Sequence, residues 1–145
     1  MKKHLLAAGL LTIATPALAE TPVLTVLTYD SFTSEWGPGP VIEKAFEATC
    51  ACDLRFVPAG DGAALLARIQ LEGKASDADV VLGLDTSLTA SAAATQLFAP
   101  HGKTPALNLP VDIADPLFLP FDWGWFAFVY DKTKVTEVPK NFEAL

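Results

Sequence analysis

The apolar and polar positions between residues 20 and 59 alternate between a strand-like and a helix-like pattern. Val23 to Tyr29 is rich in β-branched and apolar residues, which is typical of a strand. Pro40 suits the first turn of a helix. The positions that follow it at helical spacing are Val41, Ile42, Ala45, Phe46 and Thr49. Cys52 to Val57 then predicts a second strand.

The same alternation continues to about residue 95. Gly60-Asp61-Gly62 opens a second helix, and Gly73 ends it in the position that glycine favours. Its inward positions are Leu65, Leu66 and Ile69. Asp79 to Leu84 predicts a third strand, and its run Val80-Val81-Leu82 is continuously apolar, as expected for burial on both faces. Asp85 or Thr86 caps a third helix. Three strands alternating with helices predict an α/β fold with an open, mostly parallel sheet flanked by helices.

The pattern changes after residue 99. Pro100 to Pro120 contains five prolines and predicts a long irregular connection that carries an exposed His101. Trp125 to Asp131 predicts a further strand, and Pro139-Lys140-Asn141-Phe142 the start of a helix. Because a marginal helix needs about 12 residues, we expect a truncated chain.

Residues 1–19 have the organisation of a secretory signal peptide. A basic start precedes an apolar run, and Ala17-Leu18-Ala19 supplies the small residues of a cleavage site. The apolar run is too short to span a bilayer. The sequence therefore predicts export, a mature chain that begins near Glu20, and no stable membrane insertion after cleavage. The alternative is an uncleaved anchor.

The predicted mature chain is strongly acidic. The signal holds two of the 10 basic residues, which leaves 8 against 17 acidic residues and a formal charge of −9. A negative surface repels nucleic acid and anionic lipid but attracts cations. This balance favours a cationic ligand and gives no indication of nucleic-acid binding.

The two cysteines, Cys50 and Cys52, are separated by one residue. In an oxidising compartment they can pair with each other, in a small ring that restricts the unfolded chain less than a longer loop would. A redox role is the alternative interpretation. Cys50 lies at the carboxyl end of its predicted helix, where the dipole raises a thiol pKa and makes a poor nucleophile.

The candidate binding residues lie after the predicted strands. In open parallel sheets, ligands bind outside the carboxyl ends of the strands. We therefore expect three clusters to line one edge of the sheet: Tyr29-Asp30-Ser31, Gly60-Asp61-Gly62 and Gly83-Leu84-Asp85. Gly62 would let backbone amides approach a ligand at a helix start.

Each candidate residue also has a plainer structural interpretation. Asp61 fits a helix cap, and Asp85 fits that role better than a binding role. Tyr29 fits a core position, although its hydroxyl needs a polar partner. Trp36, in the Trp36-Gly37-Pro38-Gly39-Pro40 loop, fits ordinary packing over the first helix.

The residues favour binding over catalysis. With one histidine in the mature part, a histidine-based triad or a multi-histidine metal site is not indicated. No phosphate-binding glycine fingerprint occurs. We predict no catalytic residues, no metal and no cofactor.

Several motifs together resemble the periplasmic thiamine-binding proteins of bacterial ABC importers. They are Leu24-Thr25-Val26-Leu27-Thr28-Tyr29-Asp30-Ser31-Phe32, Trp36-Gly37-Pro38-Gly39-Pro40, Lys44-Ala45-Phe46-Glu47-Ala48, Cys50-Ala51-Cys52, Asp61-Gly62, Ala78-Asp79-Val80-Val81-Leu82-Gly83-Leu84-Asp85, Pro120-Phe121-Asp122 and Phe126-Ala127-Phe128-Val129-Tyr130-Asp131-Lys132. The likeness runs from about Thr21 to Leu145.

The resemblance implies the first lobe of a two-lobed periplasmic-binding-protein-like fold. Residues 20–122 would form that lobe, and residues 123–145 a crossing strand and the start of a further helix, without the second lobe. The resemblance places Asp61 and Gly62 at the ligand, with Tyr29 and Trp36 at or near it. It implies a periplasmic protein that delivers thiamine or its phosphates to the membrane permease of an ABC transporter.

Two alternatives stay open. Related two-lobed folds carry ferric ions or polyamines, although iron favours several tyrosines and the chain has only Tyr29 and Tyr130. A secreted thiamine-degrading transferase on a similar scaffold would need a cysteine nucleophile. Cys50 and Cys52 lie on the edge away from the predicted site, which disfavours the transferase.

Overall fold

The computed structural model describes residues 20–103, 108–125, 127–135 and 137–144. The predicted signal peptide, residues 1–19, lies outside these ranges. Contacts between residues divide the chain into two compact units, one that ends at Leu97 and one that begins at Phe98. No helix of the described residues is long and apolar enough to cross a membrane.

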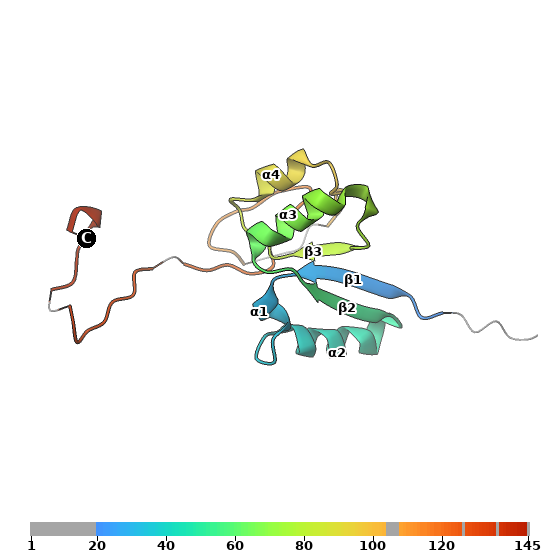
Figure 1. Ribbon diagram of the computed structural model, residues 1–145, viewed down its shortest axis with the longest axis horizontal. Coiled ribbons are helices and arrows are strands. Elements are labelled where there is room, and N and C mark those ends of the chain that lie inside the picture. The colour runs from blue at the N-terminus through green and yellow to red at the C-terminus, as the bar shows by residue number, and fades with distance from the viewer. Residues whose placement is uncertain (1–19, 104–107, 126, 136, 145) are drawn as a thin grey trace, which may run out of the picture. The chain divides into compact units, whose positions relative to one another are not determined.

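The first unit is built on a sheet of three parallel strands (Figure 1). Strand β1 (Val23–Thr28) lies in the centre, between β2 (Asp53–Pro58) and β3 (Val80–Leu82). Val23 pairs with Asp53 on one side, and Val26 pairs with Val80 on the other. The parallel α/β sheet predicted from the sequence is therefore confirmed.

Helices cover both faces of this sheet. Helices α1 (Asp30–Thr33) and α2 (Gly39–Cys50) lie on one face, and α3 (Gly62–Glu72) lies on the other (Figure 1). A short 3-10 helix, η1 (Gly73–Ala75), follows α3, and α4 (Thr89–Ala94) follows β3. Helix α1 is an addition to the prediction, because four residues are too few to give a helical period.

Helix α3 has the boundaries that its sequence predicts. Asp61 Oδ1 accepts a hydrogen bond from the Ala64 N–H at 2.9 Å, which caps the first turn. Gly73 follows the last turn with a φ of 55°, a conformation that glycine adopts without steric cost. On the outer side, Arg68 Nε lies 2.6 Å from Glu72 Oε1, as expected for a pair at i,i+4.

The core of the first unit lies between the sheet and its helices. The buried apolar residues are Val26, Leu27, Phe32, Leu54, Leu65, Leu66, Ile69 and Ala92. They include the three predicted inward positions of α3. The prediction that β3 is buried on both faces is wrong, because Val80 is 43% exposed. Among the described residues β3 has only β1 beside it, and the buried strand segment is Val26 to Thr28 of β1.

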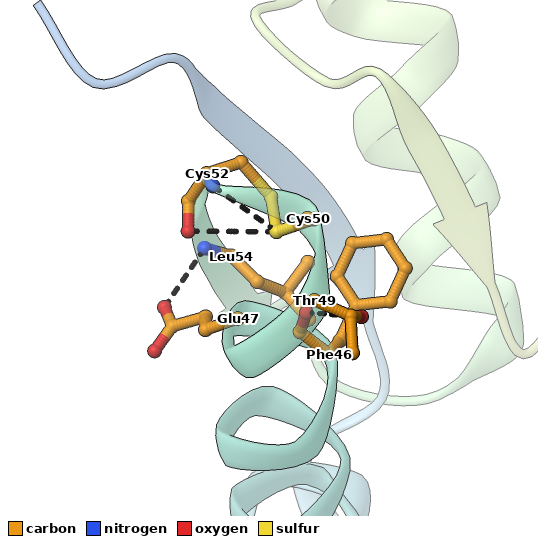
Figure 2. The surroundings of a disulfide bond; sticks show 6 residues. All are labelled: Phe46, Glu47, Thr49, Cys50, Cys52 and Leu54. Carbon is orange, nitrogen blue, oxygen red and sulfur yellow. Dashed lines mark hydrogen bonds between the residues drawn. A yellow bond between two sulfur atoms is a disulfide. The ribbon is translucent and has the colours of Figure 1, made fainter.

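The turn from α2 into β2 is closed by the Cys50–Cys52 disulfide (Figure 2). Ala51 lies between the two cysteines in the left-handed helical conformation, with φ 52° and ψ 38°. The Cys52 N–H donates to Cys50 Sγ at 3.2 Å. Glu47 reaches across the turn, and its Oε1 accepts the Leu54 N–H at 3.0 Å.

The second unit has little regular structure within its described residues. The irregular connection predicted after Pro100 is confirmed for residues 100–103 and 108–120. His101 is half-buried, and not exposed as predicted, because its Nε2 lies 2.8 Å from the Asp115 carbonyl oxygen. The predicted helix start is present as η2 (Phe142–Ala144), in which Asn141 Oδ1 accepts the Ala144 N–H at 3.1 Å.

The strand predicted over residues 125–131 is not formed in the part that the structure describes. Residues 125 and 127–131 have no strand pairing, and Phe126 lies outside the described residues. Val129 is 96% exposed. An apolar pattern rich in aromatic residues favours a strand, but a strand also needs a neighbour for its backbone hydrogen bonds. No neighbouring strand is present for this segment among the described residues.

Candidate functional site

The three loops that follow the strands meet at one edge of the sheet, as predicted. The Asp30 N–H donates to the Gly60 carbonyl oxygen at 2.9 Å, which joins the first loop to the second. A methyl group on Gly62 would lie 2.9 Å from the Gly83 carbonyl oxygen, so the second loop touches the third. These contacts follow from parallel strands whose carboxyl ends share an edge.

Asp61 and Gly62 form the start of α3 at this edge. The Asp61 side chain caps the helix, so its plainer interpretation is confirmed. Asp61 is also exposed, and its carboxylate stands beside the amide groups of the first turn. Gly62 has no room for a side chain, because a methyl group would also lie 3.2 Å from Leu88 Cδ1. A ligand role for both residues stays a prediction.

Tyr29 lies half-buried between the first and third loops. Its ring meets Phe32 edge to face, with the ring centroids 5.5 Å apart. On its other side the ring approaches Gly83, where a methyl group would lie 2.3 Å from Tyr29 Cδ1. Gly83 has a φ of 113°, so both its conformation and this contact require glycine. Tyr29 is thus held firmly at the predicted edge.

Trp36 projects from the loop between α1 and α2. The loop folds tightly against α1, because the Gly37 N–H donates to the Ser34 carbonyl oxygen at 2.9 Å. A methyl group on Gly37 would lie 2.3 Å from the Ser31 carbonyl oxygen. Trp36 itself is 81% exposed, which rules out ordinary packing over the first predicted helix, α2. Its indole is available for stacking with a flat ligand.

Asp85 does not cap the following helix, because α4 begins later, at Thr89. Its Oδ1 instead accepts the Ser87 N–H at 2.7 Å and the Ser87 hydroxyl at 2.5 Å, which closes a tight turn. The Ser87 hydroxyl, followed by its amide, holds the pKa of Asp85 below its usual value. Asp85 is therefore charged at neutral pH and committed to its own loop.

The loops at this edge carry negative charge only. Residues 29–40, 59–63 and 83–89 contain the carboxylates of Asp30, Glu35, Asp61 and Asp85, and no lysine, arginine or histidine. All four acidic residues are exposed. Exposed carboxylates attract an organic cation, and an aromatic face can stack against it.

The cysteines lie away from this edge. Cys50 and Cys52 precede β2, whereas the candidate site follows the carboxyl ends of the strands. Both sulfurs are joined in the disulfide, so neither is a free nucleophile. Among the described residues, no group of three or more His, Cys, Asp and Glu side chains is placed to hold a metal ion.

Two residues have a larger part in the geometry than the sequence pattern indicates. Asp30 belongs to the first cluster, where the pattern predicts no separate role for it, although it connects two of the loops. Gly83 is predicted only as part of the third cluster. A glycine directly after an apolar strand, on the ligand edge of a parallel sheet, is a signal that the next loop passes close to another residue.

No protein-family model matches this chain. The chain is 53% identical to the thiamine-binding periplasmic protein of Salmonella typhimurium over 137 residues. These residues cover 94% of this chain and 42% of that protein. The protein of the same name from Escherichia coli is 51% identical with the same coverage. That from Haemophilus influenzae is 44% identical over 147 residues, which cover 100% of this chain and 44% of the relative.

A solved structure gives the same result for the fold. A periplasmic thiamin binding protein superposes with a TM-score of 0.79 at 50% sequence identity, over 91% of this chain and 42% of that one. The chain is therefore similar in both sequence and fold to the periplasmic thiamine-binding proteins, as its motifs predicted, and it spans 42% of the length of the first two relatives.

Proposed function

We propose that this chain is part of an exported solute-binding protein that binds thiamine at the carboxyl edge of its sheet, in the periplasm, and performs no chemistry on it. The observation that carries the proposal is the purely acidic edge with an exposed indole, in a chain about half identical to proteins named for thiamine binding. Because the chain spans 42% of those relatives, their activity is proposed here and not assigned.

Thiamine has the chemistry that this edge would recognise. Its thiazolium ring carries a permanent positive charge, and its aminopyrimidine ring is flat and polar. Asp61 would neutralise the charge or accept a hydrogen bond from the amine. An aromatic face such as that of Trp36 contributes roughly 0.5–2 kcal/mol to cation binding. If thiamine is phosphorylated, the backbone amide groups at the start of α3 would donate hydrogen bonds to the phosphate.

Release to a membrane permease would complete the function. Two-lobed binding proteins close on their ligand by a hinge, and we expect an ABC importer to receive the ligand from the closed form. The bonded state of Cys50 and Cys52 supports a carrier and not a transferase with a cysteine nucleophile.

Native mass spectrometry of the protein purified from the periplasm of its own host tests the proposal. We expect one adduct with the mass of thiamine or a thiamine phosphate. Calorimetric titration with thiamine should then show a loss of affinity in Asp61→Ala and Tyr29→Ala. A protein that carries no adduct and takes up no thiamine in the titration would refute the proposal, and unchanged affinity in both variants would refute the site.

A further inference from the structure

Asp30 joins the end of β1 to the loop between β2 and α3 through two hydrogen bonds. Its N–H donates to the Gly60 carbonyl oxygen at 2.9 Å, and its Oδ1 accepts the Gly60 N–H at 2.8 Å. Both polar backbone groups of Gly60 are therefore held by one residue, 30 positions earlier in the chain. A hydrogen bond from the Ala59 N–H to the Thr28 carbonyl oxygen at 2.9 Å precedes this pair.

Gly60 is the residue at which the chain turns from β2 into α3. Its φ of 83° is in the range that favours glycine, so the turn is specific to this residue. Only three residues separate the end of β2 at Pro58 from the start of α3 at Gly62. Fixing Gly60 therefore fixes the direction in which Asp61 and Gly62 face the rest of the edge.

We propose that Asp30 is a positioning residue of the binding site: it sets the loop of Asp61 and Gly62 against Tyr29 through its bonds to Gly60, and this positioning contributes more to binding than its share of the negative charge of the edge. This inference rests on the proposed function. Asp30 directly follows Tyr29 in the sequence, so its bonds to Gly60 couple Tyr29 to the loop that carries Asp61 and Gly62.

A matched pair of bonds holds strand β1 at a different place. The Asp79 N–H donates to the Thr25 carbonyl oxygen at 2.9 Å, and Asp79 Oδ2 accepts the Thr25 N–H at 2.8 Å. Asp79 is exposed, as Asp30 is. It precedes β3 and so lies away from the carboxyl edge. Asp79 thus offers the same chemistry in the same sheet without contact with the candidate site.

The test compares Asp30→Ala, Asp30→Asn and Asp79→Ala in the full chain. Asparagine keeps an oxygen that accepts the Gly60 N–H but removes the charge. Hydrogen exchange of the Gly60 amide, followed by NMR, reports the bond itself, and calorimetry with thiamine reports affinity. Exchange of the Val26 amide in the centre of the sheet shows whether each variant remains folded.

We expect Asp30→Ala to speed Gly60 exchange by about 10- to 100-fold, the range that the loss of a hydrogen bond to a charged group gives. We expect it to weaken thiamine binding by about 10-fold or more. Asp30→Asn should keep both the Gly60 exchange rate and the thiamine affinity close to the wild-type values. Asp79→Ala should destabilise the fold to a similar degree and leave thiamine affinity unchanged.

Three results would overturn the inference. If Asp30→Asn loses as much affinity as Asp30→Ala while Gly60 stays protected, Asp30 acts by its charge. If Asp79→Ala weakens binding equally, the loss reflects stability alone. If Gly60 exchanges faster and affinity does not change, the loop has no part in binding. A wild-type protein that binds no thiamine refutes the proposed function itself, and is recognised before any variant is compared.

Discussion

Replacing Ala51 by glycine tests the cost of the turn between α2 and β2. Ala51 has φ 52° and ψ 38°, the left-handed helical conformation. Its side chain is exposed, so glycine removes no buried contact at this position. The Cys50–Cys52 disulfide and the bond from the Leu54 N–H to Glu47 Oε1 flank it and are retained in the variant (Figure 2). The change therefore isolates the backbone conformation.

The expected magnitude follows from two opposing contributions. An L-residue in the left-handed conformation costs about 1–2 kcal/mol. Glycine loses more backbone entropy than alanine on folding, at roughly 0.5–1 kcal/mol. Ala51→Gly should therefore raise the free energy of unfolding by about 0.5–1 kcal/mol. Ala67→Gly is the matched control, since Ala67 is exposed within the right-handed helix α3. It should lower the same quantity by about 1 kcal/mol.

Urea unfolding of the oxidised proteins, followed by circular dichroism, measures both changes. Opposite signs for the same chemical substitution support the argument, and a loss of similar size in both variants would refute it. Repeating the titration with a dithiol reductant measures the disulfide. Chain entropy for a ring of three residues gives about 1.6 kcal/mol. A much larger loss would show that the bond stabilises the folded turn directly.

Three further changes test other parts of the first unit. Thr28 Oγ1 is buried and has no hydrogen-bond partner among the described residues. Thr28→Val should therefore raise the free energy of unfolding in urea by about 1 kcal/mol, and a lower free energy of unfolding would show that the hydroxyl has a partner. Gly83→Ala should cost about 1–3 kcal/mol in thermal unfolding and shift the Tyr29 ring resonances, whereas an unchanged midpoint would contradict the close contact. The Ser76 hydroxyl, followed by Arg68, lowers the pKa of Glu72, so in Ser76→Ala an NMR titration should show that pKa raised toward 4.5. The pKa of Glu72 is lower in the folded than in the unfolded protein, so its hydrogen bonds stabilise the fold above the unfolded pKa, and this stabilisation is lost as the pH falls through the folded pKa. Equal Glu72 titration curves in the wild type and in Ser76→Ala would contradict the role of Ser76.

The parts of the fold that the sequence predicted correctly depend on local signals. Asp61 and Gly73 mark the two ends of α3 by chemistry that is complete within a few residues. The meeting of the three loops also follows from the sequence, since parallel strands bring their carboxyl ends to one edge. The bond from Asp30 to Gly60 could not be predicted, because it depends on the exact register of two strands 30 residues apart.

The failures share one physical cause, which is that periodicity shows which residues form a face but not what covers it. Val41 follows the helical period of α2, yet it is 73% exposed, because that helix packs mainly on the edge strand β2. Val129 lies in an apolar, aromatic-rich segment that fits a strand as well as β1 does by pattern. The difference is that β1 has a partner on each side, whereas residues 127–131 have none among the described residues. Strand formation is thus decided by neighbours that the segment's own residues do not encode.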